Sequence, residues 1–372
     1  MAKKADILLI NSKIYITNNN SWAEAMTISK GKIAFIGTNL EAEAWTGKKT
    51  KVINLEQKLV LPSFIDSHVH PIWAGMSLSE CDLFEQKTKA QVLKTIKEYI
   101  KSHPREKWIT GTGWNLAVFT HGNPKKEWLD NICPNKPIFL FSNDYHSAWV
   151  NSKALELAGI TQNTPDPPHG QIERNSKGEP SGTLRESAIE LVKQRIPAAN
   201  LNKKLRGLKK ALKIMNSLGI TGFQDAYCDA PVYHAAEKRG FLTARVTGAM
   251  ITAPEKSLSE QISAFQKARK QFSGQYFKPS ALKIFLDGVM ETDTASLFEP
   301  YCSHHHDALI WDPKKLQKLM QTADQKQFQL HFHAIGDRAV HAALDVIQQL
   351  EHQKPRDRRS LIAHLQLIHP DD

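Results

Sequence analysis

Two histidines one residue apart, His68 and His70, are the side chains of this sequence best suited to chemistry. They follow an apolar segment, residues 59–67, that is typical of a β-strand. Because side chains of a strand alternate between its two faces, His68 and His70 point the same way. Two neighbouring imidazoles on a rigid strand form half of a site for a divalent transition metal. The pattern predicts a metallohydrolase built on a barrel, provided that other strands supply the remaining ligands.

Three residues farther along the chain are candidates to complete that site. His333 lies near the end of an apolar segment, 328–334, and His364 lies near the end of a later one. Both positions are predicted carboxyl ends of strands, where the active sites of barrels lie. Lys283 lies inside a third apolar segment, where a charged amine is costly unless it is modified or paired. Carboxylation would turn Lys283 into a carbamate able to bridge two metal ions, and the alternative is an unmodified lysine in a salt bridge.

Other polar residues in these segments have simpler explanations. His331 shares a face with His333, but a lone interior histidine is more often a hydrogen-bonded core group than a ligand, so we assign His331 to the core. Asp225, which ends a predicted strand, is expected to be structural or to support a ligand. The three consecutive histidines at 304–306 are expected in a solvated loop.

The segments that must position these residues alternate between helix and strand from about residue 203. Leu205, Leu208, Leu212 and Met215 follow helical spacing, and Asp312-Pro313 is typical of a helix start. Strict alternation implies a parallel sheet, and a (β/α) TIM-type barrel is the expected architecture. The segments expected after the first of these helices are strand 220–226, helix from 312, strand 328–334, helix 339–350 and strand 360–366.

Two regions depart from this alternation. Residues 1–58 contain short strands separated by turns, which predicts an accessory β-sandwich layer, so the expected domains are 1–58 and 59–372. Residues from about 76 to 200 are interpreted as a lid-like insertion between early barrel strands. The residues expected to set specificity in this insertion are Tyr145, His146 and Trp149.

The remaining length sets the number of barrel units. Without the insertion, the larger domain keeps about 190 residues, or about six βα units at about 30 residues each. A complete barrel has eight units. We therefore expect a barrel that lacks its last two βα units.

Composition argues against several classes of protein, namely nucleic-acid-binding, disulfide-bonded and membrane-spanning proteins. The 372 residues carry a net charge of +11, but the basic residues are dispersed over predicted helix faces without an accompanying aromatic module, so nucleic-acid binding is not expected. The four cysteines show no CxxC pairing, which indicates a reduced, cytoplasmic protein. No segment approaches the roughly 20 apolar residues that a membrane span needs.

Five ordered motifs carry a resemblance to a known family. They are LPSFIDSHVH, NDYHSAWVNSKALELAGI, LKIFLDGVMETDTASLFEPY, LHFHAIGDRAVHAALD and LIAHLQLIHPDD. Together they resemble the amidohydrolase superfamily, in particular the branch of metal-dependent hydrolases that includes N-substituted formamide deformylases. The resemblance implies a metal-dependent barrel with an accessory β-sandwich and one or two divalent ions, with zinc expected. It implies His68 and His70 as ligands of the first strand, Lys283 as a carboxylated bridge, and His333 and His364 as residues of the fifth and sixth strands.

The expected activity is hydrolysis of a C–N bond in a small amide or cyclic amide by metal-activated water, with Lys283 and His333 as catalytic residues. Members of the family normally bring a metal-binding aspartate, the general base, on an eighth strand, whereas this sequence ends at Asp371-Asp372 after the sixth. One alternative is therefore a catalytically inactive, C-terminally truncated amidohydrolase fragment, and another is a basic scaffold that binds nucleic acid. Homo-oligomerisation is left open.

Overall fold

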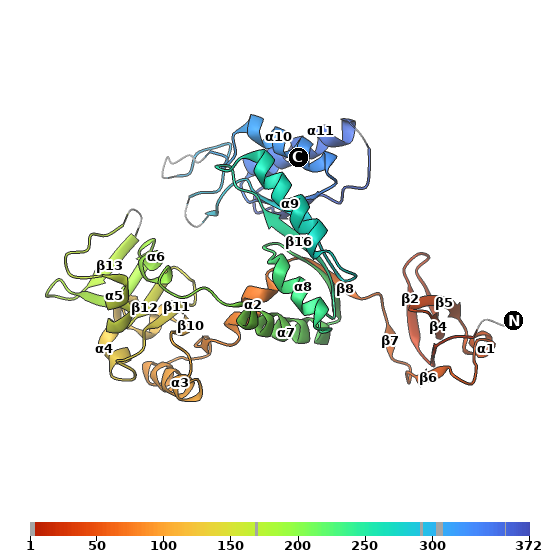
Figure 1. Ribbon diagram of the computed structural model, residues 1–372, viewed down its shortest axis with the longest axis horizontal. Coiled ribbons are helices and arrows are strands. Elements are labelled where there is room, and N and C mark those ends of the chain that lie inside the picture. Colours follow the sequence, from red (N-terminus) through yellow and green to blue (C-terminus); the bar gives the residue numbers. More distant parts are fainter. Residues whose placement is uncertain (1–3, 168–169, 291–292, 303–307, 354) are drawn as a thin grey trace. The chain divides into compact units, whose positions relative to one another are not determined.

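The computed structural model describes residues 4–167, 170–290, 293–302, 308–353 and 355–372 (Figure 1). The chain forms two compact units, Met1–Ile65 and Asp66–Asp372. No described helix has the length and apolar character needed to cross a membrane. The histidine run at 304–306 lies outside the described residues.

The first unit contains two small sheets, in the region where a β-sandwich layer is expected. A hairpin turn at Lys30 and Gly31 joins two of the strands, and both residues have a positive φ, of 51° and 72°. This combination is typical of the two-residue turns that match the twist of a hairpin. One sheet has the order β5-β4-β1-β6 and the other β3-β2-β7. The elements are β1 (Ile7–Ile10), β2 (Lys13–Ile16), β3 (Ser21–Ala23), β4 (Ala25–Ser29), β5 (Lys32–Gly37), α1 (Asn39–Glu43), β6 (Lys51–Asn54) and β7 (Leu59–Val60).

The second unit is organised around a six-stranded parallel sheet that curves into a nearly closed barrel. Its order, β8-β15-β16-β17-β18-β19, follows the sequence, as expected for successive βα units. The described residues supply six parallel strands to this sheet. The strands are β8 (Phe64–Val69), β15 (Ile220–Asp225), β16 (Arg245–Ile251), β17 (Phe277–Phe285), β18 (Gln329–Ala334) and β19 (Leu361–His364). The helices between them are α7 (Leu201–Ser217), α8 (Ala230–Lys238), α9 (Leu258–Phe272), α10 (Pro313–Gln325) and α11 (Asp337–Gln353).

Alternation along β17 and β18 separates the apolar side chains from the polar ones. Leu330 and Phe332 pack into the large core that α10 and α11 share with the sheet, and Leu282 and Ile284 of β17 do the same. The residues between them therefore face the barrel interior. In the register of the two strands, Lys283 lies opposite His331, and Phe285 lies opposite His333.

The segment before His68 differs from expectation. Residues 59–67 were expected to form one strand, but the structure has two, with β7 pairing to β2 in the first unit and β8 beginning at Phe64. Pro62 explains the interruption, because proline has no N–H to donate and restricts the residue before it. His68 lies on β8, whereas His70 directly follows the strand as the N-cap of the next helix.

The insertion has a sheet of its own, with the order β13-β14-β12-β11-β10-β9. The chain leaves the barrel after α2 (Pro71–Ser77) and returns at α7, and these helices touch at Gly75 and Gly207. A Cβ on Gly75 would lie 2.0 Å from the Gly207 carbonyl oxygen, so this approach requires glycine. The remaining elements are β9 (Cys81–Asp82), α3 (Lys89–Ser102), β10 (Ile109–Trp114), α4 (Lys126–Asp130), β11 (Ile138–Ser142), β12 (Ser147–Val150), α5 (Ser152–Ala158), β13 (Gly170–Arg174), β14 (Pro180–Glu186) and α6 (Ala188–Lys193).

Trp149, expected to contribute to specificity, lies instead in the core of the insertion. Its side chain is fully buried, its ring lies 6.5 Å from that of Trp114, and its indole N–H donates to the Lys125 carbonyl. The aromatic character that suggested binding is used for packing, with the indole N–H satisfied internally.

Candidate functional site

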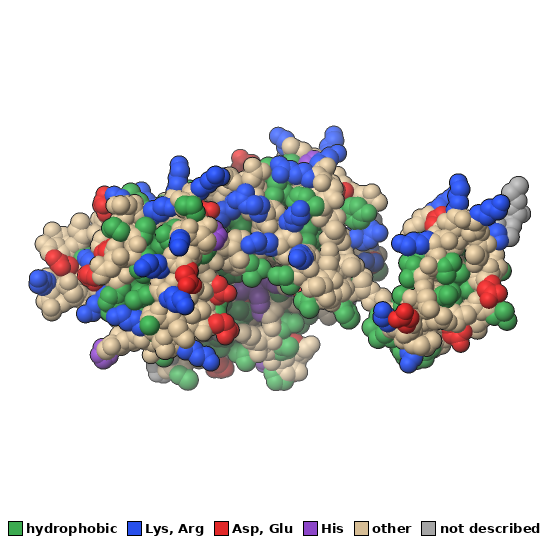
Figure 2. All heavy atoms as spheres, turned by 90° about the horizontal axis from the view of Figure 1, so that it is seen from below, with side chains coloured by type: hydrophobic (Ala, Val, Ile, Leu, Met, Phe, Trp, Pro, Cys, Tyr) green, Lys and Arg blue, Asp and Glu red, His purple; other side chains and the backbone are tan. Residues whose placement is uncertain are grey.

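Five histidines and one lysine gather inside the barrel, near the carboxyl ends of its strands. The ring of His68 lies 5.3 Å from that of His70 and 5.1 Å from that of His364. The rings of His333 and His364 lie 4.4 Å apart. All four predicted histidines are thus brought together. Figure 2 shows histidine side chains grouped in a hollow, while basic and acidic side chains are scattered over the same face.

His331 also belongs to this cluster, which the sequence reasoning missed. It is fully buried and hydrogen-bonded, as expected of a core histidine, but one of its partners is His68, whose Nδ1 lies 2.8 Å from His331 Nε2. On its other side, the side-chain amide of Gln224 lies 2.9 Å from His331 Nδ1. The chain Gln224–His331–His68 fixes the orientation of the His68 ring. Because the Gln224 amide N–H can only donate, His331 Nδ1 accepts, and the Nε2–H of His331 donates to His68 Nδ1. The proton of neutral His68 then lies on Nε2, so metal binding through Nε2 would require this chain of hydrogen bonds to rearrange.

Asp225 lies close to the ring of His70 and is hydrogen-bonded to Tyr233. Asp225 Oδ1 is 3.9 Å from His70 Nδ1, while its Oδ2 accepts a hydrogen bond of 2.7 Å from the Tyr233 hydroxyl. The backbone N–H of Tyr227 also donates to Asp225, at 2.9 Å. Burial raises the pKa of Asp225 to about 6. Asp225 therefore supports a candidate ligand from behind, which is one of the two roles expected for it.

His333 is held from the loop that follows β17. Its Nε2–H donates to the Gly288 carbonyl at 3.0 Å and lies 3.7 Å from Asp287 Oδ1. Asp287 in turn accepts backbone hydrogen bonds from Ser296 and Gly336, at 3.0 and 2.8 Å. Because Nε2 carries the proton, Nδ1 of His333 keeps its lone pair for a ligand.

Lys283 is the most unusual member of the cluster. Its side chain is 1% exposed, yet within the described part of the chain no carboxylate forms a salt bridge with it. Its Nζ lies 5.1 Å from the centre of the Phe285 ring. Burial lowers the pKa of Lys283 to about 8. The salt-bridged alternative for this lysine therefore lacks its partner among the described residues.

Burial lowers the pKa values of the histidines of the cluster. Burial lowers the pKa of His68 and of His331 to about 3, with a further contribution from the charge of Lys283. Burial also lowers the pKa of His364 to about 4, and lowers those of His70 and His333. The imidazoles are consequently neutral near pH 7, the form that binds metal ions.

The donor types fit a divalent transition metal, since neutral imidazoles are its common ligands. The positions of the side chains, in contrast, do not form a closed metal site among the described residues. Among the described His, Cys, Asp and Glu residues, no three or more are arranged closely enough around one point to hold an ion together. Instead of pointing at a common centre, the rings of His68 and His331 are hydrogen-bonded to each other.

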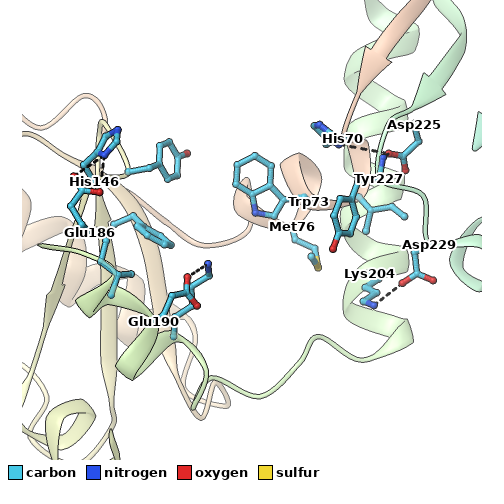
Figure 3. Close-up of a pocket in the computed structure, with 15 residues that line it drawn as sticks. His70, Trp73, Met76, His146, Glu186, Glu190, Lys204, Asp225, Tyr227 and Asp229 are labelled. Atoms are coloured by element: carbon cyan, nitrogen blue, oxygen red, sulfur yellow. Dashed lines mark hydrogen bonds and ion pairs between the residues drawn. The ribbon is translucent and has the colours of Figure 1, made fainter. Parts of the chain in front are cut away.

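A cavity of about 910 Å³ adjoins the cluster (Figure 3). On the barrel side it is lined by residues that include His70, Trp73 and Tyr227. On the insertion side the lining includes Tyr145 and His146, the other two residues expected to set specificity. Its volume falls within the range of small-molecule sites.

Comparisons with known proteins agree with this geometry. The sequence profile of the amidohydrolase family matches residues 51–372. The YtcJ protein of Bacillus subtilis, named an amidohydrolase, is 30% identical over 93% of this chain and 66% of its own length. An N-substituted formamide deformylase of Arthrobacter pascens is 26% identical over 98% of this chain and 69% of its own. The chain thus spans about two thirds of the length of both relatives.

A solved structure shares the fold. It is an uncharacterised metal-dependent hydrolase from Pyrococcus furiosus, 25% identical, with a TM-score of 0.78 over 98% of this chain and 73% of the other. The parallel strands, the clustered histidines and the family profile lead to one conclusion, which is that this chain belongs to the amidohydrolase family.

Proposed function

We propose that this chain carries the site of a metal-dependent hydrolase that cleaves a C–N bond of a small amide or cyclic amide. One observation carries the proposal: His68, His70, His333, His364 and a buried Lys283 meet at the carboxyl ends of parallel strands. In barrels of this type, that end is where catalysis takes place. The name of the Arthrobacter relative, a formamide deformylase, supports an amide substrate.

The residues that would hold one or two divalent ions are His68, His70, His333 and His364, with zinc the expected metal because the donors are imidazoles. We assign to Lys283 the role of a carboxylated bridge. Its lowered pKa supports this role, because only the neutral amine reacts with carbon dioxide, and at about 8 a useful fraction is neutral near physiological pH. A carbamate would also supply the negative charge that neutral histidines lack.

The bound metal would lower the pKa of a water molecule to about 7 and polarise the amide carbonyl. The chain's own residues orient the site. Gln224 and His331 orient the ring of His68 by hydrogen bonds before a substrate binds, and Asp225 lies 3.9 Å from His70 Nδ1. The cavity beside His70 gives an amide access to the cluster.

The test measures metal content and turnover together. The purified chain is analysed for bound metal by mass spectrometry and assayed against a panel of linear and cyclic amides, before and after chelation. We expect one or two bound ions and hydrolysis that chelation abolishes. His333→Ala should lose metal, whereas His352→Ala, at an exposed histidine of α11, should retain it.

Two outcomes contradict the proposal in different ways. Absence of stoichiometric metal from the wild type would remove the metal site itself. Bound metal without turnover of any amide would leave the site assignment in place and favour the alternative, a catalytically inactive member of the family.

A further inference from the structure

The cavity beside the histidine cluster has an aromatic wall assembled from both sides. Trp73 comes from α2 of the barrel, Tyr145 from the turn between β11 and β12, and Tyr227 from the loop after β15. The rings of Trp73 and Tyr145 are in contact, with centres 6.2 Å apart. Figure 3 shows Trp73 between His70 and the insertion side of the cavity.

These rings keep much of their surface open. Trp73 is 58% exposed, Tyr145 is 41% exposed and Tyr227 is 64% exposed. Single exposed apolar residues are ordinary, but several around one concave site mark a place where a ligand binds. An aromatic partner is favoured at such a wall, because offset and edge-to-face ring contacts add to the gain from burial.

The described lining of the cavity holds more carboxylates than lysines. Lys204 Nζ lies 2.6 Å from Asp229, and Lys193 Nζ lies 2.5 Å from Glu190. Glu186 and Asp225 also line the cavity, and each lies beside a histidine, His146 and His70. Since both lysines are already paired, an anionic ligand would meet further carboxylates, so the lining disfavours an anionic occupant.

The turn that presents Tyr145 is held in an unusual backbone conformation. Tyr145 has a φ of 64°, in the left-handed region that non-glycine residues rarely adopt. Asp144 fixes the turn by accepting from the Ser142 hydroxyl at 2.5 Å and from the His146 N–H at 3.1 Å. Glu186, with a φ of 47°, holds His146 Nδ1 at 3.0 Å. Backbone strain that the surroundings maintain is a common feature of ligand sites.

From these observations we propose that the cavity binds the substituent of the amide, and that this substituent is an aromatic group that carries no negative charge. The inference rests on the proposed function, since it assigns a substrate class to the same site. Trp73 and Tyr145 contact the aromatic ring, while the ring nitrogen of His146 that is not bonded to Glu186 remains available to a polar group of the ligand.

Binding rather than turnover tests this inference. Three probes are titrated into the full chain by calorimetry: N-(2-phenylethyl)acetamide, its cyclohexyl counterpart, and the phenyl compound bearing a para carboxylate. The phenyl compound should bind about 2- to 12-fold more tightly than the cyclohexyl one, the range expected for a ring contact. The carboxylate should bind more weakly than the parent compound.

A matched pair of variants tests whether Trp73 is responsible for the preference for the phenyl probe. Trp73→Leu should bind the phenyl and cyclohexyl probes equally. Trp22→Leu should keep the preference, because Trp22 is similarly exposed, at 61%, and also contacts a tyrosine, but lies on β3 of the first unit. Circular dichroism checks that both variants are folded.

Equal affinity of wild type for the phenyl and cyclohexyl probes would overturn the inference, as would tighter binding of the carboxylate or a preference that survives Trp73→Leu. Failure of the proposed function has a different signature. An aromatic preference without hydrolysis of any amide leaves this inference standing, whereas hydrolysis without the preference removes the inference alone.

Discussion

Replacing Lys283 with methionine should stabilise the metal-free protein while removing its proposed function. The side chain is 1% exposed, and burial lowers its pKa from the ordinary 10.5 to about 8. A displacement of that size corresponds to about 3 kcal/mol that the fold loses by keeping the amine protonated at pH 7. Methionine has a similar length and no charge, so Lys283→Met should raise the free energy of unfolding by about 2–3 kcal/mol.

The pH dependence gives this prediction a second signature. Since the folded pKa lies below the unfolded one, the unfolded chain binds more protons between about pH 8 and 10.5. The stability of the wild type should therefore rise with pH across that window. This gain in the free energy of unfolding should be lost again as the pH falls to about 8. In Lys283→Met this rise should be absent.

The assay is urea unfolding in chelator at several pH values, followed by fluorescence. Lys278→Met is the matched control, because Lys278 lies on the same strand with its side chain exposed, and its effect should stay within about 0.5 kcal/mol. In the presence of zinc the order should reverse, because the wild type gains stability from the bound metal and Lys283→Met does not. A destabilised Lys283→Met in chelator would refute the reasoning, since it would mean that the lysine is favourably paired.

Three further results are expected. Gln224→Leu should weaken metal binding about 10- to 100-fold in a chelator competition, because it releases the ring of His331 and, through it, the ring of His68. The control Gln171→Leu, on the exposed side of β13, should leave the metal affinity unchanged. Equal affinities of the two variants would exclude the positioning role of Gln224. Asn151→Ala should cost about 3 kcal/mol or more in urea unfolding, because the buried amide bonds four backbone groups, whereas Asn163→Ala at an exposed turn should be nearly neutral. Phe332→Ala should cost about 3–5 kcal/mol by the same assay, and a loss below about 1 kcal/mol would contradict its place in the core.

Much of the barrel could be predicted from periodicity. The alternation in β18 separates Leu330 and Phe332, which pack against helices, from His331 and His333, which face the interior, and this arrangement requires only the geometry of a strand. The helix start at Asp312 and Pro313 was similarly readable, since Asp312 accepts from the N–H of Lys315.

Other parts of the site depend on contacts that no local pattern contains. His331 bonds to a residue 263 positions away, and the contact exists because the sheet curves until β18 faces β8. The assignment of Trp149 to specificity was wrong for a related reason. Its neighbours Tyr145 and His146 lie in a turn at the cavity, but Trp149 itself lies on a strand whose residues are all buried. Residue types alone do not separate an aromatic wall from an aromatic core.

The contact between His68 and His364 also bears on the order of folding. These residues lie on β8 and β19, the two outermost strands of the six-strand order, and their rings lie 5.1 Å apart. An ion held by both would cross-link strands that are almost the full length of the barrel unit apart in sequence. The loop closed in this way is long. Such contacts form late in folding, because the chain loses the entropy of loop closure before it gains the free energy of the contact. Metal uptake would then report that β19 has docked beside the other strands, and it could be used to follow this step of barrel folding.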